Sequence, residues 1–351
     1  MWSFFEHSDD SMARTMTLVR LSPDQWRDFA LSHPDSTTFH HPEWQELLRS
    51  HYGFRWMAPA LVERGDIVAA APFLETRTFS GRRKLTCLPF SDCVTPLARG
   101  PDHLAEYWRA LQQEPLNRYP SVVVRTGGPA PPVPSGTDWV RHLVDLRRAE
   151  EPLVLPSSVR RNLRKAERAG LTYARRADPG AIEEFYRLHV LTRRKLGVPV
   201  QTRGYFRALH ERIIASGLGF VGAVSRGSEV IGAGVFLQFG STLIYKYGAS
   251  HPAALSDRPN ELLFARTLGI AQDEGYARFD FGVTRRTNEG LRRFKEKWGG
   301  VESPVFHAYI RGHPPDGSRP GVAHRVAATA IRRSPTFVCR ALGAALYRYA
   351  P

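Results

Sequence analysis

A strongly basic segment follows a short apolar strand near residue 280. Residues 279–301 read FDFGVTRRTNEGLRRFKEKWGGV. The alternation at the start predicts a buried strand that ends near Gly282, and the polar loop after it leads into a basic helix over 288–297. A helix placed directly after a strand begins at the carboxyl edge of the sheet, where ligand sites of α/β proteins open. The segment therefore predicts a helix that meets an anionic ligand.

A second basic segment lies between the two halves of the chain. Residues 155–170 read LPSSVRRNLRKAERAG, which predicts a helix that a serine caps and that Gly170 ends. Arg160 and Arg164 fall on one line at i, i+4 spacing, with Lys165 beside them. Like charges at this spacing repel, so they make the helix less stable than mixed charges would. Contact with phosphate or nucleic acid and a solvated basic face are the two alternatives.

The composition limits the class of protein. The chain has 351 residues, enough for about two domains, and 42% of them are hydrophobic. A formal net charge of +15 favours anionic partners, although an Arg-rich proteome gives the same balance. Three cysteines without metal-binding spacing argue against a disulfide framework or a zinc site and fit a reducing cytoplasm. The acidic N-terminus is not typical of a signal peptide, and no apolar run reaches the ~20 residues of a membrane span.

The two halves repeat one order of elements. Each half reads β-α-α-β-β-β-α-β, and the second adds a helix and a strand. LVERGDIVAAAPFL (61–74) matches AVSRGSEVIGAGVFL (223–237) through a turn and the next strand, allowing one inserted residue. The pattern predicts a duplicated α/β (α+β) fold, with a chance hairpin likeness as the alternative. The expected parts are a flexible N-terminus at 1–14, a first domain at 15–148, a second at 149–311 and a helical tail at 312–351.

Three of the expected strands are long, at ten residues each. Residues 54–63 and 66–75 each predict one strand, joined by a tight turn at Arg64-Gly65. STLIYKYGAS (241–250) predicts another strand, in which every second residue lies on the same face. Its two tyrosines, at 245 and 247, are therefore expected to share a face.

Seven motifs in order resemble those of one family. They are FHHPEWQELL (39–48), LPFSDCVTPL (88–97), SSVRRNLRKAERAGL (157–171), KYGAS (246–250), RPNELL (258–263), FDFG (279–282) and GLRRFKEKWGG (290–300). They resemble the motifs of Fem-type aminoacyltransferases and BioF2-like acetyltransferases, within the Gcn5-related N-acyltransferase (GNAT) superfamily, over about residues 16–310. The resemblance implies two tandem GNAT-like domains, each a mixed, twisted sheet flanked by helices. It also implies a transferase that moves an acyl or aminoacyl group onto an amine. In the best-known members the donor is aminoacyl-tRNA and the acceptor is a peptidoglycan precursor.

One segment departs from the GNAT enzymes that use acetyl-CoA. Those enzymes carry Q/R-x-x-G-x-G/A between the fourth strand and the next helix, where backbone N–H groups hold the pyrophosphate. This chain has ASHPAALSDRPNELL (249–263) at that place, and Pro259 removes one donor from the helix start. The departure favours aminoacyl-tRNA over CoA as the donor, and it leaves open a CoA bound by another route.

Several side chains could carry the transfer. By resemblance, Lys295 lies near the transferred group, where it offsets developing charge or binds a donor phosphate; a solvated lysine is the alternative. Asp280 faces away from the phenylalanines beside it and could orient a lysine, accept a proton or form a structural salt bridge. Tyr247 and Tyr245 could hydrogen-bond the acceptor or donate to the leaving oxygen, with a core position as the alternative. The alternative is a helix cap for Asn260 and a turn for Ser91 and Asp92. The other candidates for substrate contact are Arg160, Arg164, Lys165, Arg258, Asn260, Ser91, Asp92, Arg292 and Trp298.

The C-terminal tail predicts a basic amphipathic helix. Phe337, Leu342 and Leu346 recur at helical spacing among arginines. Such a helix could rest on an anionic membrane or pack back onto the domains.

Three functions follow from these patterns. The first is Fem-type aminoacyl or peptidyl transfer, from an aminoacyl-tRNA donor to an amine of a cell-wall precursor or peptide. The second is acyl-CoA-dependent N-acetylation of a small-molecule or sugar amine. The third, from another class, is RNA binding without catalysis. We expect a cytoplasmic acyltransferase without a tightly bound cofactor or metal, which reaches the inner membrane face at most through its tail.

Overall fold

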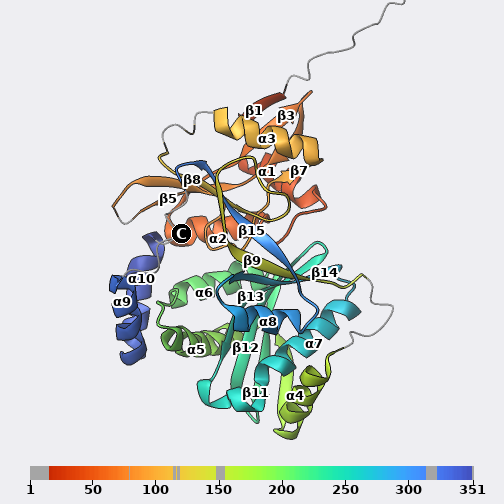
Figure 1. Ribbon diagram of the computed structural model, residues 1–351, viewed down its shortest axis with the longest axis vertical. Helices are drawn as coiled ribbons and strands as arrows, with labels where there is room; N and C mark the ends of the chain where they lie inside the picture. Colours follow the sequence, from red (N-terminus) through yellow and green to blue (C-terminus); the bar gives the residue numbers. More distant parts are fainter. Residues whose placement is uncertain are drawn as a thin grey trace, which may run out of the picture.

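The chain folds into two β-sheets, and helices cover both faces of the larger one (Figure 1). The computed structural model describes residues 16–78, 80–113, 116, 119–147, 155–313 and 322–349, with side chains from residue 328 in the last range. The N-terminus expected to be flexible, 1–14, lies outside the described residues. The α/β (α+β) class expected from the sequence is confirmed.

The first half of the chain builds the small sheet and one end of the large sheet. Its first helix begins where Ser22 and Gln25 form a capping box, and its second begins where the His41 side chain accepts from the Glu43 amide. The elements are β1 (Met16–Arg20), α1 (Pro23–Ser32), α2 (Pro42–Tyr52), β2 (Arg55–Met57), β3 (Pro59–Glu63), β4 (Asp66–Ala70), β5 (Phe73–Arg77), β6 (Arg83–Thr86), β7 (Leu97–Ala98), α3 (Pro101–Gln113), β8 (Val122–Thr126) and β9 (Ser135–Asp145).

The expectation of single strands over 54–63 and 66–75 is wrong. Each segment breaks in two, because the hairpin that they form crosses from one sheet to the other. β3 and β4 pair in the small sheet, whereas β2 and β5 pair in the large sheet. The breaks fall at Ala58 and at Ala71-Pro72, and proline cannot donate a ladder hydrogen bond.

The second half builds the rest of the large sheet. Its elements are α4 (Ser157–Arg168), β10 (Leu171–Arg176), α5 (Pro179–Leu196), α6 (Arg203–Leu209), β11 (Gly219–Arg226), β12 (Glu229–Phe239), β13 (Thr242–Ser250), α7 (Pro259–Asp273), β14 (Arg278–Arg285), α8 (Glu289–Glu296) and β15 (Val301–Arg311). A π-helical turn follows α6 over His210–Ile214. The serine cap expected for α4 is absent, because this helix starts one residue earlier, after Pro156, without a side-chain cap.

The large sheet runs through both halves of the chain. Its eleven strands lie in the order β10-β11-β12-β13-β14-β9-β15-β8-β6-β5-β2. β9, from the first half, lies between β14 and β15 and pairs antiparallel with both. β15 in turn pairs with β8 of the first half. The expected boundary between residues 148 and 149 lies outside the described residues.

Helices cover the second half of the sheet on two sides. α5 and α6 bury Phe185 and Phe206 in a core that continues into the first half. α7 buries Leu263 and Phe264 in a separate core with Phe279 of β14. Both faces of the sheet are therefore apolar and covered by helices. A charged side chain that points from a strand into either core lies away from bulk water.

The tail packs on the second half through two helices, α9 (Val322–Arg333) and α10 (Thr336–Leu346). The Arg193 guanidinium of α5 donates to the Tyr347 hydroxyl at 2.8 Å, and Cys339 is fully buried. None of the helices in the described ranges is long and apolar enough to cross a membrane.

Candidate active site

Strands β13 and β14 run in parallel over three residues and then separate. The paired residues are Thr242–Ile244 and Arg278–Asp280, although β13 continues to Ser250 and β14 to Arg285. Gly282 lies just after the separation with a φ of +67°. A β carbon there would meet Asp92 Oδ2 and the Tyr245 carbonyl oxygen at 3.2 Å. The glycine of the FDFG motif therefore lets the two strands and a loop of the first half approach one another.

The Lys295 side chain reaches from α8 to this point. Its Nζ donates to the Gly282 carbonyl oxygen at 2.9 Å and to the Val283 carbonyl oxygen at 3.4 Å. The residue is 3% exposed, and burial lowers the pKa of its ammonium to about 8, against the opposing charges of Asp280 and Asp92. A solvated lysine, the alternative from the sequence, does not fit this burial. Lys295 is a buried cation whose third N–H has no partner among the hydrogen bonds of the described residues.

Asp280 is fully engaged by its neighbours. Its Oδ2 pairs with Arg141 of β9 at 2.7 Å, and its Oδ1 accepts from the Gly282 amide at 2.8 Å. The carboxylate is 1% exposed. With both oxygens occupied, Asp280 fixes the shape of the strand end and the position of Arg141.

Asp92 brings the first half of the chain to the same point. Its Oδ1 accepts from Lys246 Nζ at 3.1 Å, and the same ammonium donates to the Phe90 carbonyl oxygen at 2.6 Å. Burial lowers the pKa of Lys246, and Asp92 opposes that shift. The Asp92 side chain is 16% exposed, so a solute can reach it. Its Oδ2, close to Gly282, accepts no hydrogen bond from the described residues.

Ser91, the neighbour of Asp92, has a structural environment. Its hydroxyl accepts from the Trp44 indole at 2.8 Å, and its carbonyl oxygen accepts from Arg125 at 3.1 Å. The residue is 3% exposed. Ser91 thus holds the loop that presents Asp92.

The two tyrosines of β13 do not share a face, so that expectation is wrong. The pairing of β13 with β12 shifts register at Lys246, which is an extra residue in a β-bulge. Tyr245 consequently packs against Phe264 on the α7 side, whereas the Tyr247 hydroxyl lies 3.1 Å from that of Tyr205 on the α6 side. Burial raises the pKa of both hydroxyls well above the ordinary value.

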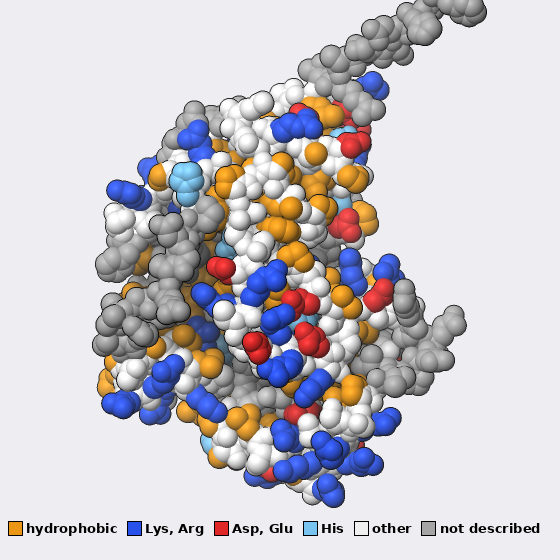
Figure 2. All heavy atoms as spheres, in the orientation of Figure 1, with side chains coloured by type: hydrophobic (Ala, Val, Ile, Leu, Met, Phe, Trp, Pro, Cys, Tyr) orange, Lys and Arg blue, Asp and Glu red, His pale blue; other side chains and the backbone are white. Residues whose placement is uncertain are grey.

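The basic residues of α4 lie elsewhere. Arg160, Arg164 and Lys165 are exposed, and Arg164 lines an open hollow of about 630 Å³ with Arg161, Glu167 and Arg168. Figure 1 places α4 at the lower end of the molecule and α8 near its middle. Figure 2 shows Lys and Arg side chains gathered at that lower end. The structure therefore does not bring the α4 cations to Lys295.

The predicted residues of α7 lie at its first turn. Arg258 has a φ of +64° and lies 3.9 Å from Glu261, which also accepts from Asn162 of α4. Asn260 Oδ1 accepts from the Ser250 hydroxyl at 2.6 Å, so it joins the helix start to the end of β13. These contacts tie α4, α7 and β13 together.

Two further predicted residues flank Lys295 on the chain. Arg292 forms a two-pronged pair with Glu302 of β15, at 2.7 and 3.0 Å. Trp298 is 1% exposed and packs against Phe264 and Phe294. Both hold α8 against the sheet.

Three partly buried cations were not predicted from the sequence. Lys246 lies between the two tyrosines, Arg141 on β9 and Arg125 on β8. Each looks like an ordinary outward-facing residue of a half-buried strand, and only the exchange of strands between the halves buries it. Arg141 also lines a cavity of about 500 Å³ with Cys93, Thr242 and other residues of both halves.

Comparison with known proteins identifies the second half. Residues 155–296 match the family described as acetyltransferase (GNAT) domain. These residues are a GNAT acyltransferase domain. The protein is accordingly a transferase of class EC 2.3, and GNAT enzymes take the acyl donor as a substrate. No curated protein sequence matches the chain significantly.

Solved structures share the fold over most of the chain. FemX is 14% identical, with a TM-score of 0.63 over 83% of this chain and 96% of FemX. The C-terminal domain of a protein described as a lysylphosphatidylglycerol synthetase from Agrobacterium fabrum is 13% identical, with a TM-score of 0.54 over 88% and 93% of the two chains. A protein of unknown function from Bacteroides thetaiotaomicron is 9% identical, with a TM-score of 0.52 over 84% and 99%. The chain shares the fold of these three proteins.

Proposed function

We propose that this GNAT protein transfers an aminoacyl group from aminoacyl-tRNA to a primary amine of a cell-wall precursor or peptide. The observation that carries the proposal is the meeting of Lys295 and Asp92 beside Gly282, where β13 and β14 separate. A cation can stabilise the oxyanion formed in aminolysis of an ester, and a reachable carboxylate can act as the general base.

The chemical step divides between these groups. The acceptor nitrogen attacks the ester carbonyl, the C–N bond forms and the C–O bond to the ribose breaks. Asp92 takes the proton that the nitrogen loses, because its side chain is 16% exposed and its Oδ2 has no hydrogen-bond partner among the described residues. The Lys295 ammonium stabilises the negative oxygen of the tetrahedral intermediate, and Asp92 passes the proton taken from the nitrogen on to the leaving ribose oxygen. Asp280 and Arg141 act as positioning residues.

The start of α7 supports tRNA over CoA as donor. A 3₁₀ helix (Pro252–Asp257) and the left-handed Arg258 stand where a glycine-rich turn would hold a pyrophosphate. Pro259 has no N–H, and no side chain caps this helix start. The exposed cations of α4 and α7 offer a separate surface for RNA phosphates.

The donor is tested directly with the purified chain. We expect transfer of a labelled amino acid from a pool of charged tRNAs to a peptidoglycan-precursor pentapeptide, detected by mass spectrometry and abolished by ribonuclease. Transfer from acetyl-CoA with release of free thiol, and none from charged tRNA, would replace this donor by the second candidate. The match to an acetyltransferase family is the observation that favours this second candidate.

RNA binding without catalysis fits the buried charges poorly. Burying the charges of Lys246, Lys295 and Asp280 costs solvation free energy. Binding to RNA phosphates needs only exposed cations, so it does not explain these buried charges. Tight tRNA binding without transfer from either donor would nevertheless replace our proposal by this third candidate.

Contact with a membrane surface is a proposal for the tail alone. Phe337 on α10 is 64% exposed, and Arg333 and Arg340, which lie before and after it in the sequence, are exposed as well. We expect sedimentation with anionic phospholipid vesicles that falls at high salt and in Phe337→Ser. Equal sedimentation of Phe337→Ser and the unchanged chain would remove the proposal.

A further inference from the structure

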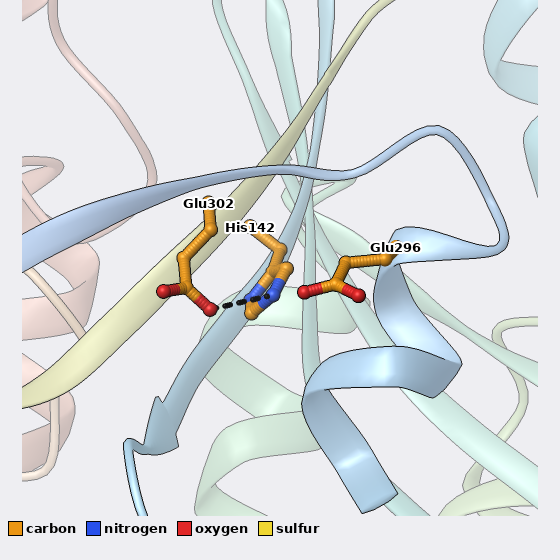
Figure 3. A group of neighbouring side chains, drawn as sticks. All are labelled: His142, Glu296 and Glu302. Atoms are coloured by element: carbon orange, nitrogen blue, oxygen red, sulfur yellow. Dashed lines mark ion pairs between the residues drawn. The ribbon is translucent and has the colours of Figure 1, made fainter. Parts of the chain in front are cut away.

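Three potential metal ligands converge beneath α8, outside the groups used above. His142 of β9 and Glu302 of β15 are direct cross-strand partners, and Glu296 ends α8 above them. One ligand atom from each lies within 4.8 Å of the other two. Figure 3 shows the two carboxylates on either side of the imidazole, both turned toward it.

His142 is the unusual member of this group. It is 0% exposed, and neither of its ring nitrogens has a hydrogen-bond partner among the described residues. Nε2 lies 3.4 Å from Glu302 Oε2, without the geometry of a hydrogen bond. A buried imidazole normally fills both nitrogens, because an unsatisfied polar group costs about 1–3 kcal/mol. A group outside the described residues, such as a metal ion, would satisfy it.

We propose that His142, Glu296 and Glu302 bind a divalent transition-metal ion. One imidazole and two carboxylates form a ligand set suited to Zn²⁺ or Mn²⁺, with water in the remaining positions. This proposal contradicts the expectation of a metal-free protein and does not depend on the acyl-transfer proposal.

The distances require one adjustment. Bonds of 2.0–2.2 Å to a tetrahedral ion place ligand atoms roughly 3.4 Å apart, which is close to the His142–Glu302 separation. Glu296 is exposed, so its side chain is free to move inward by about an ångström.

Arg292 does not block the site. Its pair with Glu302 uses two of about four lone-pair positions on that carboxylate. A carboxylate that binds a metal is commonly oriented by such a partner. Arg292 and the Lys295 ammonium, whose charge also acts on His142, balance the two carboxylates. A bound cation would therefore be held by its bonds to the three ligands and not by an excess of negative charge. The bound ion would fasten the end of α8, and thus Lys295, to β9 and β15.

Metal titration of the untagged full chain tests the proposal. After dialysis against a chelator, we expect one equivalent of Zn²⁺ to bind, and Co²⁺ in its place to give a visible absorption band. Glu296→Gln should weaken binding at least about tenfold. Because Glu296 is exposed, this variant keeps the fold. The matched control is Glu289→Gln at the other end of α8, whose carboxylate is 70% exposed and pairs only with Arg293 among the described residues.

Two results would overturn the proposal. One is the lack of stoichiometric Zn²⁺ binding by the unchanged chain. The other is equal affinity in Glu296→Gln and Glu289→Gln, which would assign the ion to other surface groups. Neither readout uses acyl transfer, so the result is independent of the donor and the acceptor.

Discussion

Arg141 and Asp280 form an ion pair between β9 and β14, with 2.7 Å between Nη2 and Oδ2. Removing the carboxylate in Asp280→Asn would leave the guanidinium with little compensation, although Arg141 keeps 18% of its surface exposed. We expect a loss of about 3 kcal/mol in the free energy of unfolding, at the low end for a buried pair. Urea denaturation measures it. Asp145→Asn, which removes an exposed partner of Arg147, should cost at most about 1 kcal/mol; equal losses would contradict the prediction.

Replacement of Lys295 tests the role of its charge. Lys295→Met keeps most of the side-chain volume and removes the ammonium, so we expect acyl transfer to fall about 10²–10³-fold. Circular dichroism and thermal unfolding should show a folded protein. Lys297→Met, two residues further along on an exposed position, should keep nearly full activity. Equal activity of the two variants would remove Lys295 from the chemistry.

Gly282 should resist substitution. Gly282→Ala places a β carbon 3.2 Å from Asp92 Oδ2 at a positive φ, which costs about 1–2 kcal/mol of stability. Displacement of Asp92 should also lower transfer. Gly290→Ala is the matched control, because its φ is ordinary for a helix and its β carbon meets no atom within 4 Å. That variant should be unchanged or more stable by up to about 1 kcal/mol. Similar unfolding midpoints for the two variants would show that the strand separation tolerates a side chain.

Stability should fall in mild acid because of His40. Burial, together with the charges of His33 and Arg141, lowers the pKa of His40 to about 4, while the Thr95 carbonyl and Asp35 oppose the shift. The unfolded chain binds the proton near pH 6.5, so the neutral form stabilises the fold above that pH. This stability is lost as the pH falls from about 6.5 to about 4, by about 3 kcal/mol.

The change is measured as the free energy of unfolding against pH. His40→Gln should lower stability at pH 7 and show a shallower fall toward pH 4. Burial lowers the pKa of the buried His189 and of the half-buried His307 as well, so these residues keep part of the slope in both proteins. Parallel curves for the variant and the unchanged chain would contradict the assignment to His40.

The sequence predicted where helices and strands lie better than it predicted which strands pair with one another. The residue patterns located α4, α8 and β14, because periodicity reports which face of an element is buried. It did not reveal that the hairpin of residues 55–77 crosses between two sheets, since Ala58 and Ala71 read as ordinary strand residues. The bulge at Lys246 was equally hidden, and it decides which way two tyrosines point.

The candidate site was predicted in part. The FDFG glycine, Lys295 and the Asp92 loop were found because motif order and a basic helix after a strand mark them. Arg141 and His142 were missed, because β9 belongs to the first half of the chain and its contacts come from β14, β15 and α8. Strands that pair across so many residues leave no signal in the sequence around either strand.

The insertion of β9 between β14 and β15 has a consequence for folding. A fragment that begins at residue 155 would carry two strands whose inner edges have lost their neighbour, and unpaired edges aggregate. We therefore expect the halves to melt in one cooperative transition, and neither half to remain monomeric when produced alone.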